Sequence, residues 1–149
     1  MRTIHRDIVG AFIFSADGKL LLGQNRSGGV YRGRMVPPGG GVEEGETLEQ
    51  ALIREVSEET AIGIDDASVE RLHPDLTGQS PKVLRETGEE VIVDMTFHDF
   101  KIVLPLNASD VQFSDDDDFT AMQWLAPDEI DRYDYSPATT ERLKDIGLL

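Results

Sequence analysis

The residues best suited to chemistry are three glutamates, Glu55, Glu58 and Glu59, which stand at positions i, i+3 and i+4. On an α-helix these spacings place the side chains on one face. Like charges in this arrangement repel one another by roughly 0.2–0.5 kcal/mol per pair. A divalent cation would offset that repulsion, because hard cations such as Mg²⁺ prefer carboxylate oxygens. The spacing therefore indicates a metal site, with a solvated acidic helix face as the ordinary alternative.

A glycine-rich segment lies just before this acidic stretch. Pro37 and Pro38 are followed directly by the run Gly39–Gly41. Glycine lets a backbone approach a ligand closely and present its N–H or carbonyl groups. A glycine-rich loop next to clustered carboxylates predicts a site for a metal ion and a phosphate, although a tight turn alone would also explain the glycines.

Taken together, these segments resemble the Nudix box of the Nudix hydrolases. The box spans Gly40–Ile62 and reads Gly40, five residues, Glu46, seven residues, and then REVSEETAI over 54–62. Each fixed position of that pattern is matched except the last glycine, which is Ala61 here. If that position needs a positive φ, alanine costs about 1 kcal/mol there. The departure affects the end of the helix and leaves the carboxylates in place.

The resemblance implies a catalytic role for four side chains of the box. Glu55 or Glu58 is the expected general base. Arg54 and Glu46 are expected to form an ion pair that braces the loop against the helix. The alternative for Arg54 is an ordinary surface ion pair, which would contribute little to stability.

The resemblance also implies a metal centre that uses Mg²⁺, for which Mn²⁺ can substitute. The expected ligands are the backbone carbonyl of Gly39 and the carboxylates of Glu55, Glu58, Glu59 and Asp118. Asp118 ends the acidic run 115–118. A solvated loop that protects a strand edge would explain the same run.

The resemblance implies substrate contacts from the loop over 25–34 and from the glycines. Arginine binds phosphate in a bidentate fork, and an aromatic ring can stack on a base. The expected contacts are Arg26, Tyr31, Arg32, Arg34 and Gly40. A plain surface role is the alternative for Arg32 and Arg34, and core packing is the alternative for Tyr31.

The composition limits the possible partners. The chain has 149 residues, with 29 Asp and Glu against 14 Lys and Arg, and a formal net charge of −15. Because no basic stretch is visible, we expect no binding to duplex nucleic acid or to an anionic membrane. The absence of cysteine excludes thiol nucleophiles and cysteine-bound metals. Without a secretory signal or an apolar run of ~20 residues, the protein is expected to be cytoplasmic.

Local patterns place the box in a mixed α/β context within one domain over 1–149. A capping box at Thr47–Gln50 starts the helix, which should end near residues 60–62. The expected strands cover 8–14, 20–22, 67–75, 91–104 and 122–125, with a polar loop over 76–90 and a second helix over 137–146. The predicted fold class is α/β, a Nudix-type α/β/α sandwich with a mixed β-sheet.

The resemblance implies Mg²⁺-dependent hydrolysis of the pyrophosphate linkage in a nucleoside diphosphate derivative. A nucleoside triphosphate, including an oxidised one, is the first candidate for so short a chain. A nucleotide sugar or an ADP-ribose-like dinucleotide is the alternative, with the 76–90 loop closing over its second moiety. A Nudix module that senses a nucleotide without turnover would be favoured by loss of a box carboxylate, and none is lost. A homodimer is expected only by analogy with the family.

Overall fold

The computed structural model of the chain describes residues 1–25, 32–114 and 119–149. Its strands are β1 Arg2–Phe14, β2 Leu20–Asn25, β3 Met35–Val36, β4 Gly39–Gly41, β5 Ser68–Arg71, β6 Leu76–Val83, β7 Glu90–Val103 and β8 Phe119–Leu125. Its α-helices are α1 Leu48–Thr60 and α2 Pro137–Asp145, and the short 3₁₀ helices η1 Ala108–Asp110 and η2 Pro127–Arg132 precede and follow β8.

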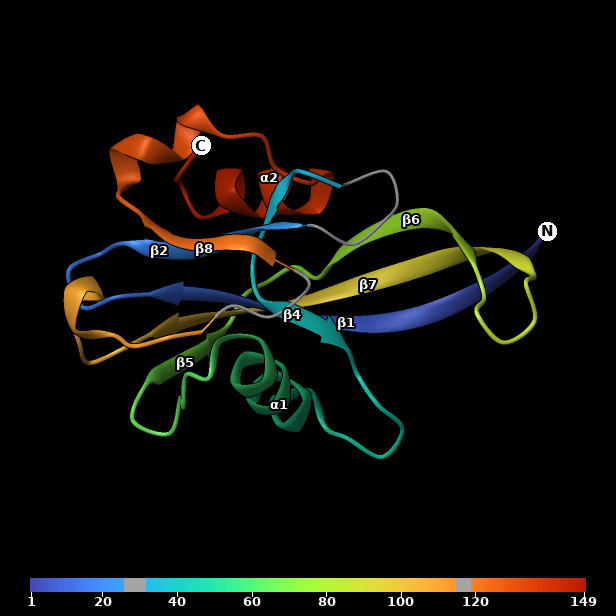
Figure 1. The fold of residues 1–149 in the computed structure, drawn as a ribbon, viewed down its shortest axis with the longest axis horizontal. Helices are drawn as coiled ribbons and strands as arrows, with labels where there is room; N and C mark the ends of the chain where they lie inside the picture. Colours follow the sequence, from blue (N-terminus) through green and yellow to red (C-terminus); the bar gives the residue numbers. More distant parts are fainter. Residues whose placement is uncertain (26–31, 115–118) are drawn as a thin grey trace.

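The strands form one mixed sheet in the order β3-β2-β1-β7-β5, with β4 on β1, β6 on β7 and β8 on β2. β1 and β7 are parallel, and the other strand pairs are antiparallel. The two α-helices lie on opposite faces of this sheet (Figure 1). The predicted α/β/α sandwich with a mixed sheet is therefore confirmed.

Alternating side chains of β1 supply a core on each face of the sheet, as the period of two in a strand requires. Val9 and Ile13 pack on one face with Leu52 of α1. Phe12 packs on the other face with Leu143 of α2. Neither α-helix in the described part of the chain has the length and hydropathy needed to cross a membrane.

The sheet extends beyond both helices as a three-stranded wing, made of residues 2–7 of β1, 76–83 of β6 and 90–96 of β7 (Figure 1). The prediction of a polar loop over 76–90 was therefore wrong. Gly78 and Pro81 are typical strand breakers, but β6 pairs only with β7 among the described strands. Proline is tolerated on such an edge strand, because its missing N–H has no partner to lose.

Three further boundaries differ from the predictions. β1 begins at Arg2 instead of residue 8, and the strand predicted over 67–75 is limited to Ser68–Arg71. The glycine run, predicted as a loop, is strand β4 and pairs with β1 from Ile8–Gly41 to Gly10–Gly39. A run without side chains carries no hydrophobic pattern, so nothing in it indicated a strand.

Candidate active site

Helix α1 begins and ends where the sequence predicted. The backbone N–H of Gln50 donates to Thr47 Oγ1 at 3.1 Å, and the N–H of Thr47 donates to Gln50 Oε1 at 2.9 Å, which completes the capping box. At the other end Ala61 has a φ of 60° in the left-handed region. The position therefore does require a positive φ, and the cost of about 1 kcal/mol for alanine applies.

The three glutamates of α1 share a face but differ in burial. The side chain of Glu58 is 57% exposed and that of Glu55 is 13% exposed. Glu59 is buried, and its Oε2 accepts a hydrogen bond of 2.9 Å from the backbone N–H of Gly39. The acidic face therefore lies against β4 at Glu59 and opens to solvent at Glu58.

Each glycine of β4 faces a different neighbour that leaves no room for a side chain. A β-carbon at Gly39 would collide with the backbone carbonyl of Val9 in β1. A β-carbon at Gly40 would lie 2.5 Å from Glu55 Oε1, and one at Gly41 would lie 2.6 Å from an Nη of Arg6. The run is glycine because strand pairing, a carboxylate and a guanidinium each need that space.

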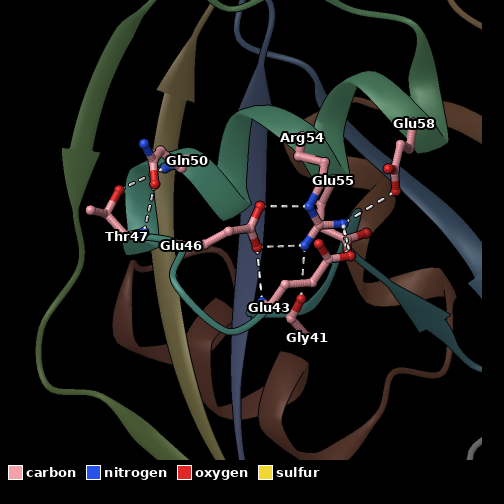
Figure 2. Close-up of polar contacts among 8 residues, drawn as sticks. All are labelled: Gly41, Glu43, Glu46, Thr47, Gln50, Arg54, Glu55 and Glu58. Carbon is pink, nitrogen blue, oxygen red and sulfur yellow. Dashed lines mark hydrogen bonds and ion pairs between the residues drawn. The ribbon is translucent and has the colours of Figure 1, made fainter.

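Arg54 forms five hydrogen bonds, three that join α1 to the residues before it and two within α1 (Figure 2). Its Nε and Nη2 grip Glu46 at 2.7 and 2.9 Å, and Nη2 also donates to the Gly41 carbonyl at 3.0 Å. Its Nη1 donates to Glu55 Oε1 at 2.9 Å and to Glu58 Oε2 at 3.3 Å. A guanidinium has five N–H donors, so Arg54 uses all of them within the box.

This network shifts the proton affinities of its members. Hydrogen bonds from Arg54 and from the Glu43 N–H lower the pKa of Glu46 to about 2. The hydrogen bonds to Glu46 raise the pKa of Arg54 above its ordinary value. Burial raises the pKa of Glu55, against the lowering effect of its hydrogen bond from Arg54. Glu46 is therefore held as a carboxylate, whereas Glu55 takes up a proton more readily than a solvated glutamate does.

The donor chemistry of this face fits a hard divalent cation. Glu55 and Glu58 both direct an oxygen to the same nitrogen of Arg54, so their carboxylates already share one positive charge. Across the described residues, no three acidic or histidine side chains converge closely enough to form a complete cage. Mg²⁺ does not require a cage, since proteins usually hold it with one or two carboxylates, several waters and substrate phosphates.

Of the predicted substrate contacts, Gly40 lies against Glu55, whereas the two described arginines of the loop show no contact with these glutamates. Arg32 and Arg34 are exposed, and Arg34 Nη1 donates to the carbonyl of Tyr135 at 3.5 Å. Arg26, Tyr31 and Asp118 lie outside the described residues.

Sequence reasoning missed two features of the site. One is Arg6, whose guanidinium lies against Gly41. The other is a cavity of about 160 Å³ beside the box, lined by Gly39 and Gly40 together with Phe97, Asp99 and Ser136. No local pattern marks these residues, because they meet only through the pairing of β1 with β4 and β7.

Comparisons with known proteins agree with this geometry. The family model of the NUDIX domain matches residues 4–145. Nucleoside triphosphatase NudI of Escherichia fergusonii is 28% identical over 147 residues, which cover 97% of this chain and 98% of that protein.

Solved structures share the fold. The E. coli dihydroneopterin triphosphate pyrophosphohydrolase has a TM-score of 0.70 at 20% identity, over 93% of this chain and 92% of that one. The NUDIX domain of Shewanella oneidensis NrtR, solved with ADP ribose, has a TM-score of 0.64 at 19% identity, over 94% and 89%. With a family model that spans nearly the whole sequence and a box whose parts meet in one site, the chain belongs to the Nudix family of pyrophosphohydrolases.

Proposed function

We propose that this protein is a Mg²⁺-dependent enzyme that hydrolyses the pyrophosphate linkage of a nucleoside diphosphate derivative, with a nucleoside triphosphate as the first candidate. The observation that carries the proposal is the acidic face of α1, where Glu55 and Glu58 converge on Arg54 and Glu59 meets Gly39. The similarity to a nucleoside triphosphatase over nearly the full length of both chains supports the choice of substrate.

The proposed metal ligands are the carboxylates of Glu55, Glu58 and Glu59 and the carbonyl of Gly39, with Asp118 as a further ligand from outside the described residues. Mg²⁺ bound there supplies charge that polarises a phosphoryl oxygen and lowers the pKa of a bound water. Such a cation also removes the repulsion between an anionic pyrophosphate and a chain of net charge −15.

The chain's own residues position the reaction and move its proton. Glu55 or Glu58 accepts a proton from the attacking water, whose oxygen forms a bond to phosphorus. The P–O bond of the anhydride breaks, and the leaving phosphate keeps the electron pair. Arg54 and Glu46 hold the glycine strand against α1, so the carboxylates stay aligned with the phosphates.

The small cavity beside the box supports a nucleoside as the rest of the substrate. Its lining is largely apolar and includes Phe97, with a few polar groups from Asp99 and Ser136. Sites for small ligands usually combine such an apolar lining with a few polar groups that fix orientation. Because Gly39 and Gly40 line the same cavity, a base placed there would extend its phosphates toward Glu55.

A nucleotide sugar or an ADP-ribose-like dinucleotide is the second candidate. One specific observation favours it: a groove of about 1110 Å³ lies on the wing, far larger than a terminal phosphate needs. A solved relative of the same fold is bound to ADP ribose. The second moiety would lie along the strand β6, since residues 76–83 of the expected loop form this strand and only the turn after it remains.

The test is a panel of nucleoside triphosphates, nucleotide sugars and ADP-ribose, assayed with Mg²⁺ and with chelator, with the nucleotide and phosphate products separated. Glu58→Gln should reduce turnover by about 10²–10⁴-fold. Thermal stability should change little, because the Glu58 side chain is mostly exposed. Glu49→Gln, an exposed position on the same helix, is the matched control and should keep full turnover. The proposal fails if no anhydride is cleaved with any divalent ion, or if Glu58→Gln is as active as the control.

A further inference from the structure

A wide groove lies on the wing, outside the region between the two α-helices. This groove of about 1110 Å³ is lined by β1, β6, β7 and the turn that follows β6. Its floor is apolar and includes Ile8, Val93 and Met95. Arg6, Lys82 and Arg85 add positive charge to the lining.

The cations of this groove differ from four arginines elsewhere in the chain. Arg2, Arg54, Arg71 and Arg142 each form an ion pair with a carboxylate. Within the described residues, by contrast, Arg6, Lys82 and Arg85 have no carboxylate at ion-pair distance.

The acids of the groove do not cancel these cations. Glu86 and Glu90 also line it, and both are exposed. Three cationic side chains against two acidic ones leave a net positive lining. In a chain with 29 acids and 14 bases, a lining of this kind repels an anionic group less than an acidic surface does.

The groove lies next to the Nudix box in the folded chain. Arg6 lines the groove, and its guanidinium lies against Gly41, whose carbonyl accepts a hydrogen bond from Arg54. Ile8 lines both the groove and the smaller cavity beside Gly40. A ligand that leaves the box along β1 therefore meets Arg6 first.

We propose that this groove binds a second phosphorylated group of the substrate, joined to the nucleoside through the scissile diphosphate. Arg6 contacts the phosphate next to the box, and Lys82 and Arg85 contact the group attached to that phosphate further along the groove. The inference rests on the proposed function and favours its second candidate, because a nucleoside triphosphate would leave most of the groove unfilled. Arginine is suited to the role near the diphosphate, since its planar fork matches phosphate oxygens.

The first experiment measures binding without turnover. The Glu58→Gln protein is titrated with ribose 5-phosphate, and with ribose as the uncharged control, while backbone amide NMR signals are followed. We expect saturable shifts at Arg6 and Lys82 with the phosphate alone. The triple change Arg6→Gln, Lys82→Gln, Arg85→Gln should abolish them. Arg132→Gln and Lys144→Gln, which change exposed cations outside the groove, should not. Equal shifts with ribose, or no shifts in the groove, would overturn the proposal.

The second experiment measures specificity in the active protein. The double change Lys82→Gln, Arg85→Gln should raise KM for ADP-ribose about tenfold, the loss expected for one hydrogen bond from a charged donor, with kcat little changed. KM for a nucleoside triphosphate should change less than about twofold, because its phosphates end near Arg6 and do not reach these two side chains. Equal changes for the two substrates would contradict a role for the groove.

The two experiments also separate this inference from the proposed function. If ribose 5-phosphate binds in the groove and no anhydride is cleaved, the proposed function fails and the groove assignment stands. If anhydrides are cleaved and the groove does not bind the phosphate, the groove assignment fails and the proposed function stands.

Particle mass is measured in parallel. A dimer that becomes a monomer in the triple variant would assign the groove to a second copy of the chain and overturn the proposal.

Discussion

The box and the wing each contain an arginine–glutamate fork of nearly the same geometry. In the box, Arg54 Nε and Nη2 donate to Glu46 at 2.7 and 2.9 Å. In the wing, Arg2 Nε and Nη2 donate to Glu89 at 3.2 and 2.9 Å. The side chains of the box fork are 22% and 17% exposed, whereas those of the wing fork are 58% and 41% exposed. Water and salt therefore screen the wing fork much more strongly.

The difference shows that the surroundings of an ion pair decide what it contributes. Arg54 also binds Glu55, Glu58 and the Gly41 carbonyl, so its loss would leave several acceptors without a donor. Arg2 serves Glu89 alone among the acceptors described here. In the box, Arg54 cross-links several residues of the site. On the wing, the cations of the groove remain accessible to a ligand.

The strongest test of this comparison replaces one arginine in each fork. Arg54→Gln should lower the free energy of unfolding by about 2 kcal/mol, because it removes charged hydrogen bonds from a partly shielded network. Turnover should fall by about 10²-fold or more as the carboxylates lose alignment. Arg2→Gln should change stability by less than about 0.5 kcal/mol. Urea unfolding and initial rates measure both, and equal losses in the two variants would refute the distinction.

A second test adds a methyl group at Gly40, where the side chain of Glu55 approaches the backbone. Gly40→Ala should push Glu55 away from its place and cost about 1–3 kcal/mol, since a β-carbon would lie 2.5 Å from Oε1. Turnover should fall with it. Gly63→Ala is the matched control, because its added methyl meets no atom within 4 Å and its φ is not positive. A Gly40→Ala protein with control-like stability and rate would show that the close approach is dispensable.

A third test concerns the end of the box helix. Ala61→Gly should stabilise the protein by up to about 1 kcal/mol, because glycine adopts a φ of 60° without the strain that alanine bears. The rate should stay unchanged, since Ala61 contacts none of the glutamates described above. The midpoint of thermal unfolding reports the effect, and a marked destabilisation would contradict the left-handed geometry.

The smallest expected effect is a loss of folding stability at acid pH. Glu46 has a pKa of about 2 in the folded chain, against an ordinary value of 4.5. A lowered folded-state pKa contributes stability that is present above pH 4.5 and is lost as the pH falls toward 2. An NMR titration of the Glu46 carboxyl should show a midpoint near 2. A midpoint near 4.5 would mean that Arg54 and Glu46 are as weakly coupled as an exposed pair.

The sequence predicted the box helix well because its signals are local. Thr47 and Gln50 stand at capping-box spacing, the glutamates stand at helical spacing, and Ala61 occupies the position where the helix ends. These features depend on neighbours within a few residues, which a single sequence displays.

The rest of the site depends on contacts between distant residues. Arg6 precedes Gly41 by 35 positions and meets it only because β1 pairs with β4. The groove likewise needs β6, whose glycine and proline predict a break, and whose place at the sheet edge is a property of the whole fold. The register of a strand and its position at the edge of a sheet depend on tertiary contacts. No short stretch of the sequence reveals them.

β1 and β7 run in unbroken parallel register from Arg2–Val91 to Phe14–Val103, so the wing and the core of the sheet share the same two strands. Bending the wing against the core of the sheet would break consecutive backbone hydrogen bonds between β1 and β7. Arg6 in the wing and Val9, which packs with α1 in the core, lie on the same paired strand. A molecule that reaches both the groove and the box therefore meets a span set by this ladder, and its own length must match that span.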